Sequence, residues 1–135
     1  ERPRFDVTAA DHRRLLDGFM RAAASGDRTA MRALLADDVR LVGDGGGRVP
    51  TFRQVLHGGD RIANLYWATA KRLGGQVAYR MVRINGEAGL LRYVEGRLES
   101  AQSFLTGGGR ILAIYTMRNP DKLVGIPAPH RTPFH

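Results

Sequence analysis

Residues 77–117 read VAYRMVRINGEAGLLRYVEGRLESAQSFLTGGGRILAIYTM, and this stretch decides the fold. Polar and apolar residues alternate along it, and turn sequences interrupt the alternation at Asn85-Gly86, at Glu95-Gly96 and at the glycines 107–109. Asn-Gly between alternating runs is a strong signal for a two-residue hairpin turn. The stretch therefore predicts an antiparallel meander of four strands. We expect these strands over residues 77–84, 89–94, 99–105 and 110–117.

The sequence before residue 77 has a helical period instead. Thr8, with Asp11 three positions later, resembles a capping box and begins a helix expected over residues 9–25. Gly26 ends this helix, because glycine tolerates the left-handed conformation of a helix C-cap. Asp27 caps a second, short helix. The apolar face of the first helix consists of Leu15, Leu16, Phe19, Met20 and Ala23, and that of the second of Met31, Leu34 and Leu35.

A short pair of strands and a third helix complete the predicted elements. The strands are expected at 39–42 and 51–56, and the helix at 60–73. Helices segregated to one side of an antiparallel sheet form an α+β layer structure. The order of elements is similar to that of NTF2-like folds, which include SnoaL-like polyketide cyclases. This resemblance implies a cone in which three N-terminal helices pack on a curved antiparallel sheet and leave a pocket at the open end.

Length and charge restrict the class of protein. The chain has 135 residues, enough for one domain. It has 21 Lys and Arg residues against 13 Asp and Glu, a net charge of +8 that raises the question of nucleic-acid binding. The basic residues never run longer than two together and form no stripe, which favours an arginine-rich, solvated surface. Direct nucleic-acid binding therefore stays a minority hypothesis.

Several kinds of site are not expected. The chain has no cysteine, which excludes disulfides and thiolate metal sites. Its four histidines lack ligand spacing, so we expect neither metal nor cofactor. The longest apolar run, 111–115, is too short to span a membrane, and we expect a cytoplasmic protein without a membrane partner. The histidines are His12, His57, His130 and His135.

A pocket in such a fold would be lined by inward-facing aromatic and polar side chains. Such residues also fit a packed core, and both faces of 77–84 and 89–94 carry apolar residues, so the pattern does not decide which face points inward. The candidates are Phe19, His57, Trp67, Tyr79, Arg92, Tyr93, Gln102, Phe104 and Tyr115.

An enzyme of this fold, such as an isomerase, needs a carboxylate base and a Tyr or a protonated acid that holds an enolate oxygen. Asp44 and Tyr115 are the candidates for these two roles, although Asp44 also fits a turn residue before glycines. Glu95 and Glu99 lie at or beside predicted turns. The catalytic hypothesis is therefore the weaker one.

Two short segments of the sequence carry specific motifs. The run Asp44, Gly45, Gly46, Gly47, Arg48 is similar to an Asp-Gly-Gly-Gly-Lys motif, with Arg48 in place of Lys. The run Asn119, Pro120, Asp121, Lys122, Leu123 matches an Asn-Pro-Asp-Lys-Leu motif. Both resemble motifs of the SnoaL-like carboxy-terminal extension of SigJ-type extracytoplasmic-function sigma factors.

This resemblance implies a regulatory domain that folds against the sigma domains of a longer parent chain. The chain begins without an initiator Met, which agrees with that expectation. Through the sigma domains its partners would be RNA polymerase and promoter DNA, with both motif segments at the contact and a small molecule as candidate ligand of the pocket. We expect the domain at 1–123, a Pro-containing extended tail at 124–135, and a monomer or weak homodimer. The alternative is a small isomerase or polyketide-cyclase-type enzyme acting on an apolar ring substrate.

Overall fold

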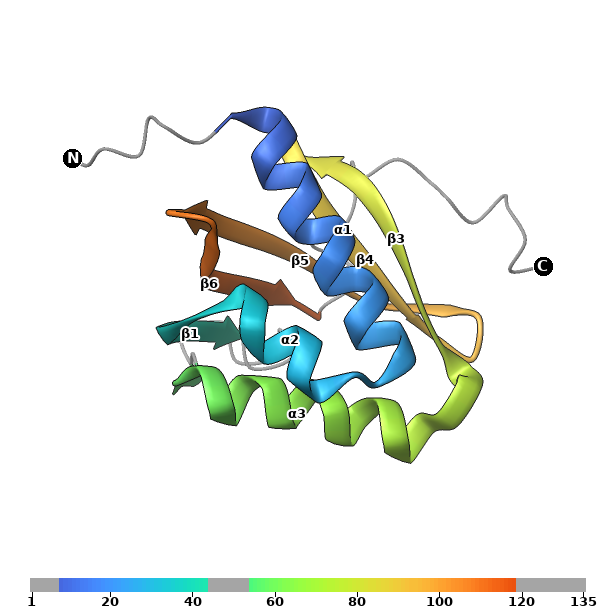
Figure 1. Ribbon diagram of the computed structural model, residues 1–135. Coiled ribbons are helices and arrows are strands. Elements are labelled where there is room, and N and C mark those ends of the chain that lie inside the picture. Colours follow the sequence, from blue (N-terminus) through green and yellow to red (C-terminus); the bar gives the residue numbers. More distant parts are fainter. Residues whose placement is uncertain (1–7, 44–53, 119–135) are drawn as a thin grey trace.

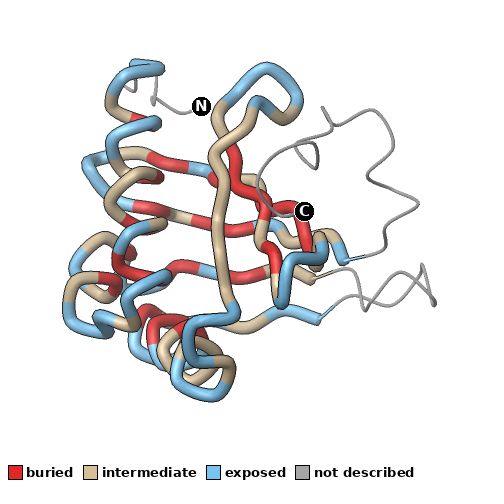
Figure 2. The backbone as a smooth tube through the Cα atoms, turned by 90° about the vertical axis from the view of Figure 1, so that its right-hand side faces the viewer, coloured by how far each residue is buried: buried red, intermediate tan, exposed pale blue. Residues whose placement is uncertain are grey.

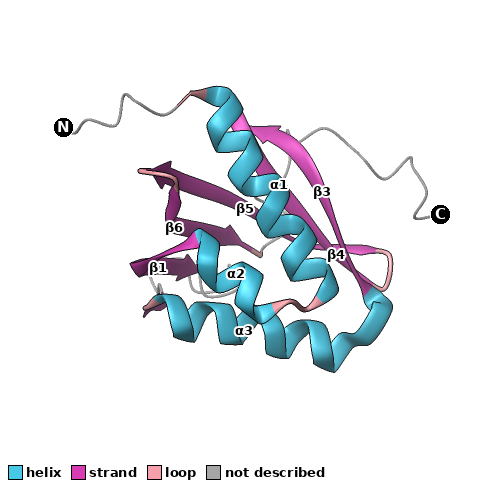
Figure 3. Cartoon of the chain, viewed as in Figure 1, coloured by secondary structure: helices cyan, strands magenta, loops and turns pink. Residues whose placement is uncertain are grey.

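The computed structural model describes residues 8–43 and 54–118, which form three α-helices and a six-stranded sheet (Figure 1). The helices lie together on one side of the strands (Figure 3). In chain order the elements are α1 (Ala9–Ser25), α2 (Arg28–Leu34), β1 (Leu35–Gly43), β2 (Gln54–His57), α3 (Gly59–Leu73), the 3-10 turn η3 (Gly74–Gln76), β3 (Val77–Ile84), β4 (Glu87–Val94), β5 (Arg97–Gly107) and β6 (Arg110–Met117).

The helix boundaries follow the capping residues that the sequence predicts. The Thr8 hydroxyl accepts a hydrogen bond from the backbone N–H of Asp11 at 3.0 Å, and Gly26 ends α1 with φ 74°. The Asp27 carboxylate accepts one from the N–H of Ala30 at the start of α2. Leu35, expected on the second helix, is instead the first residue of β1, with extended backbone angles and a fully buried side chain. An apolar residue at a helical period is equally able to begin a buried strand.

The sheet has the order β2-β1-β6-β5-β4-β3. The predicted meander is confirmed, because β3 to β6 pair antiparallel in sequence order. Its turns Asn85-Gly86 and Glu95-Gly96 have positive φ at both residues, as a type I′ hairpin requires. The sheet is thus mostly antiparallel, but β1 pairs with β6 in parallel. This parallel pair brings the carboxyl ends of β1 and β6 to the same edge of the sheet, where Gly43 lies opposite Thr116.

The main hydrophobic core lies between the helices and one face of the sheet. Phe19 of α1 is at its centre and packs edge-to-face on Tyr66 and Phe104, with ring centroids 5.0 and 5.8 Å away. Buried stretches also run along the strands (Figure 2). A second cluster of Leu91, Tyr93 and Ala101 lies on the opposite face, because successive strand residues point to opposite sides. The fully buried residues of the main core include Leu16, Met31, Leu35, Val39, Ile62, Leu90, Ile111 and Ile114.

Candidate functional site

Two pockets open in the described part of the chain, at different ends of the layer between helices and sheet. The first, here called the histidine pocket, has a volume of about 760 Å³ and lies between the start of α1, the β3–β4 hairpin and β5. The second, here called the arginine pocket, has a volume of about 650 Å³. The arginine pocket is lined by Leu41, Gly43, Gln54, Val55, Leu56, Leu65, Tyr66, Thr69, Arg72, Arg92, Thr116 and Arg118.

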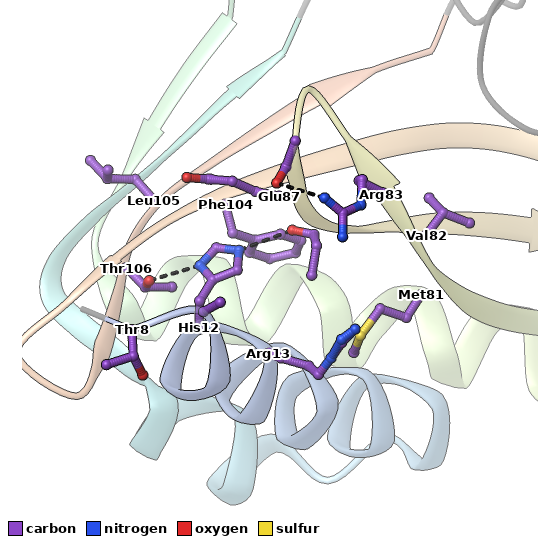
Figure 4. A pocket seen from close by; sticks show the side chains of 13 residues that line it. Thr8, His12, Arg13, Met81, Val82, Arg83, Glu87, Phe104, Leu105 and Thr106 are labelled. Atoms are coloured by element: carbon purple, nitrogen blue, oxygen red, sulfur yellow. Dashed lines mark hydrogen bonds between the residues drawn. The ribbon is translucent and has the colours of Figure 1, made fainter.

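His12 and Thr106 are buried polar residues that line the histidine pocket, and His12 has the central position in its hydrogen bonds (Figure 4). Its Nδ1 lies 2.8 Å from Thr106 Oγ1 and its Nε2 lies 2.9 Å from the carbonyl oxygen of Ala88. Because a carbonyl oxygen only accepts, Nε2 carries the proton, and in the neutral ring Nδ1 accepts from the Thr106 hydroxyl. Both ring nitrogens are therefore used to tie α1 to β4 and β5. The sequence signal for this role is that His12 precedes Leu16 and Phe19 on the apolar face of the helix.

Arg92 organises the polar side of the arginine pocket. Its Nε donates a hydrogen bond to Glu99 Oε1 at 2.9 Å, and its Nη1 lies 3.5 Å from the Tyr79 hydroxyl. The guanidinium also lies over the ring of Tyr66, 5.7 Å from the centroid. The other carboxylate oxygen of Glu99 accepts from Arg118 Nη2 at 2.7 Å. One carboxylate on β5 thus joins Arg92 of β4 to Arg118, which directly follows β6, at the wall of the pocket.

A β-bulge explains why Glu99 reaches this position. Arg92 pairs with Ser100 and Tyr93 with Leu98, so Glu99 is the extra residue of β5. The sequence predicts Glu99 beside a turn, at the start of the strand expected over 99–105. The strand begins earlier, at Arg97, so Glu99 lies within β5, and its side chain is 22% exposed. A bulge of this kind leaves no simple mark in the alternation, because it depends on the partner strand.

The ion pairs keep Glu99 ionised. Burial alone would raise the pKa of the Glu99 carboxyl, but hydrogen bonds and charge from Arg92, with further hydrogen bonds from Ser100 and Arg118, outweigh it and lower the pKa to about 2. A carboxylate with so low a pKa is a poor general base at neutral pH. Glu99 is therefore suited to hold arginines in place.

A buried hydrogen-bond chain lies behind the arginine pocket. The Tyr66 hydroxyl donates to Gln102 Oε1 at 2.9 Å, and Gln102 Nε2 donates to Ser100 Oγ at 3.2 Å. Burial raises the pKa of Tyr66 strongly, so its hydroxyl keeps its proton. The chain connects α3 to β5 and fixes the wall on which Arg92 rests.

Some of the predicted pocket residues lie at these two sites. Arg92 lines the arginine pocket, and Tyr79 and Gln102 belong to the polar network behind it. Phe104 lines the histidine pocket. Phe19 is fully buried in the core.

The other predicted pocket residues line neither pocket. Trp67 is partly buried against the core, and the Lys71 ammonium lies over its ring, 5.4 Å from the centroid. Tyr93 lies on the opposite face of the sheet, and His57 is exposed on β2. Tyr115 is also exposed, and its hydroxyl accepts a hydrogen bond from Arg40 Nη2 at 2.9 Å. Asp44, its suggested catalytic partner, lies outside the described residues.

The motif segments 44–48 and 119–123 also lie outside the described residues, but the residues that flank them are described. Gly43 and Gln54, on either side of 44–53, line the arginine pocket, and so does Arg118, directly before Asn119. Both segments therefore leave the described fold at the rim of one pocket.

Two further features of the described residues restrict the chemistry. No three His, Asp or Glu side chains of residues 8–43 and 54–118 gather in an arrangement that could hold a metal ion. None of the helices in these ranges is long and apolar enough to cross a membrane.

No protein-family model matches the chain. In sequence it is 29% identical to the extracytoplasmic-function RNA polymerase sigma factor SigJ of Mycobacterium tuberculosis, over 89% of this chain and 41% of SigJ. The crystal structure of that sigma factor superposes with a TM-score of 0.68 at 27% identity, covering 86% of this chain and 45% of SigJ. The chain thus spans less than half the length of SigJ.

Other solved structures share the fold at lower identity. A SnoaL-like protein from Burkholderia thailandensis superposes with a TM-score of 0.64 at 14% identity, over 82% of this chain and 96% of that one. An NTF2-like protein from Burkholderia xenovorans gives 0.60 at 17% identity, over 82% and 84%. The chain is a homologue of the carboxy-terminal region of the SigJ sigma factor, with an NTF2/SnoaL-like fold.

Proposed function

We propose that this chain is a regulatory domain of an extracytoplasmic-function sigma factor, and that it controls transcription initiation by contacting the sigma domains of the same protein. Homology to SigJ supplies the context of RNA polymerase. The observation that carries the regulatory role is that segments 44–53 and 119–123 both join the described fold at the rim of the arginine pocket. The two motif segments, far apart in the sequence, thus leave the described fold at the same pocket.

The parallel pairing of β1 and β6 is the physical reason for this common origin. Gly43 lies opposite Thr116, so the chain leaves both strands at the same edge of the sheet. Loops that leave neighbouring points of a rigid scaffold are well placed to form one contact surface. The docking residues in this proposal are Asp44, Gly45, Gly46, Gly47, Arg48, Asn119, Pro120, Asp121, Lys122 and Leu123.

A ligand in the arginine pocket could regulate this contact with the sigma domains. A ligand changes the balance between two arrangements of a protein only when it binds one of them more tightly than the other. We expect a pocket lined by the residues that flank both docking segments to meet this condition, because docking of these segments would change the surroundings of the ligand. The sigma domains and the ligand would then affect each other's affinity reciprocally.

Reconstituted transcription tests the proposal. The full-length protein that carries this domain is compared with variants that lack residues 45–47 or that end after Leu123, on a promoter its sigma domains recognise. We expect both variants to change transcript output, whereas the surface variant Arg61→Ala, at an exposed position of α3, leaves it unchanged. Output that is indifferent to both changes, and to removal of the whole domain, would refute the regulatory role.

A further inference from the structure

One wall of the arginine pocket carries arginine side chains, and its opening is lined by apolar side chains. Val55 and Leu65 line it, although they are 49% and 43% exposed and belong to the few large apolar side chains that the described surface leaves in solvent. Leu41 and Leu56 extend this apolar lining inward. An exposed apolar surface next to fixed polar groups is typical of a small-molecule site, and a volume of about 650 Å³ lies in the usual range for one.

The charged residues that line the pocket, within 8–43 and 54–118, are all positive. They are Arg72, Arg92 and Arg118, and no Asp or Glu of these ranges is among the lining residues. Glu99, which lies behind the wall, pairs with Arg92 and Arg118. Among the described residues, Arg72 and Arg92 stand against this one carboxylate, which leaves an excess of one positive charge without counting Arg118. A partly enclosed site with such an excess attracts an anion.

Hydrogen-bonding capacity also remains at the wall. Arg92 uses Nε and Nη1 for Glu99 and Tyr79, and no described residue accepts from its Nη2. Arg72 forms no ion pair with any residue of 8–43 or 54–118. The hydroxyl oxygen of Thr116 is buried and has no hydrogen-bond partner among the described residues. A buried polar group without a partner is costly in a folded protein, and a bound ligand would supply the missing partner.

We propose that the arginine pocket binds a small amphipathic carboxylate. The two carboxylate oxygens accept hydrogen bonds from Arg92 and Arg72, whose planar fork matches a carboxylate, and the Thr116 hydroxyl donates to one of them. The apolar part of the ligand covers Val55 and Leu65 at the mouth. The inference deepens the proposed function and rests on it for its regulatory meaning, because the pocket is lined by Gly43 and Arg118, the residues directly before the two docking segments.

Calorimetric titration of the 135-residue chain with octanoate, 1-octanol and octyl sulfate tests the ligand class. Octanoate carries the proposed carboxylate, octanol has the same apolar chain without a charge, and octyl sulfate replaces the planar group by a tetrahedral one. We expect octanoate to bind at least about tenfold more tightly than octanol, as for a charge-assisted hydrogen bond. Equal affinity for octanoate and octanol would refute the anion site. Equal or tighter binding of octyl sulfate would refute the assignment to a carboxylate.

Variants locate the site. We expect Arg92→Gln to weaken octanoate binding about 10- to 100-fold, Arg72→Gln about 3- to 10-fold and Thr116→Val about 2- to 5-fold. Arg61→Gln, which removes the same charge from α3 outside both pockets, should leave the affinity unchanged. Circular dichroism checks that each variant is folded. If Arg92→Gln unfolds, the exposed Arg72 and the isosteric Thr116→Val still decide the matter, and unchanged affinity in both refutes the site.

The binding and transcription experiments can refute the ligand proposal and the regulatory proposal independently. An absence of octanoate binding together with an effect of residues 45–47 on transcription would refute the ligand and leave the regulatory domain. Octanoate binding with transcription indifferent to the domain would refute the regulatory role and leave a carboxylate-binding domain.

Discussion

The histidine pocket and the arginine pocket are similar in size, but their polar groups are used in opposite ways. In the histidine pocket the buried imidazole of His12 spends both nitrogens on Thr106 and Ala88. In the arginine pocket Arg92 and Thr116 keep hydrogen-bonding groups that no described residue satisfies. The comparison teaches that the volume of a pocket says little about its role. Polar groups already satisfied by the protein hold the fold, whereas unsatisfied ones are available to a ligand.

The largest loss of stability is expected for a substitution of Arg92 in the arginine pocket. Arg92→Ala removes an ion pair whose arginine side chain is only 13% exposed, and leaves Arg118 as the remaining ion-pair partner of Glu99 among the described residues. We expect a loss of about 2–4 kcal/mol in the free energy of unfolding, measured by urea denaturation. Arg83→Ala, at an exposed residue of the histidine pocket, should cost no more than about 0.5 kcal/mol. Equal losses would mean that the Arg92 network contributes no special stability.

His12→Ala is expected to lower the free energy of unfolding without changing ligand binding in the arginine pocket. It removes both hydrogen bonds that tie α1 to β4 and β5, and we expect it to cost about 2–3 kcal/mol of unfolding free energy. Octanoate affinity should stay within about twofold, because His12 does not line the arginine pocket. The exposed neighbour Arg13, changed to Ala, serves as the control. A parallel loss of octanoate binding in His12→Ala would contradict the independence of the pockets.

Acid should remove the stability that the ion pairs of Glu99 contribute, over a pH range set by the pKa of Glu99. The pKa of Glu99 lies near 2 in the folded chain, against 4.5 for the free side chain, so folding favours its ionised form. Its contribution to stability is complete above about pH 4.5 and is lost as the pH falls toward about 2. Because the carboxylate is partly exposed, we expect this contribution to be about 1–2 kcal/mol. Unfolding free energies measured from pH 7 to pH 2 should show a smaller acid loss in Glu99→Gln, and identical profiles would contradict the prediction.

The smallest expected effect compares two threonine hydroxyls. Thr116→Val removes a hydroxyl without a hydrogen-bond partner, so its unfolding free energy should change by less than about 0.5 kcal/mol or rise slightly. Thr106→Val removes the partner of His12 and should cost about 1–2 kcal/mol. Thermal unfolding of both variants measures the difference. A larger loss for Thr116→Val would show that its hydroxyl is already satisfied in the folded protein.

Much of the fold follows from local signals. The two-residue turns at Asn85-Gly86 and Glu95-Gly96 set the meander, and Thr8, Gly26 and Asp27 set the helix ends, because each acts through backbone angles or hydrogen bonds within a few residues. Arg92 was also among the predicted pocket residues. The predicted pocket residues of 77–84 and 89–94, Tyr93 among them, could not be assigned to a face of the sheet from the sequence, because both faces of these two strands carry apolar residues.

The sequence by itself thus determined the elements, their order and the α+β class. Only the tertiary structure decided the parallel pairing of β1 with β6, the bulge that turns Glu99 toward Arg92, and the common edge at which Gly43 and Arg118 reach the arginine pocket. The physical reason is distance along the chain. Turns and caps are satisfied by neighbouring residues, whereas strand partners and ion pairs between strands depend on segments that only the complete fold brings together.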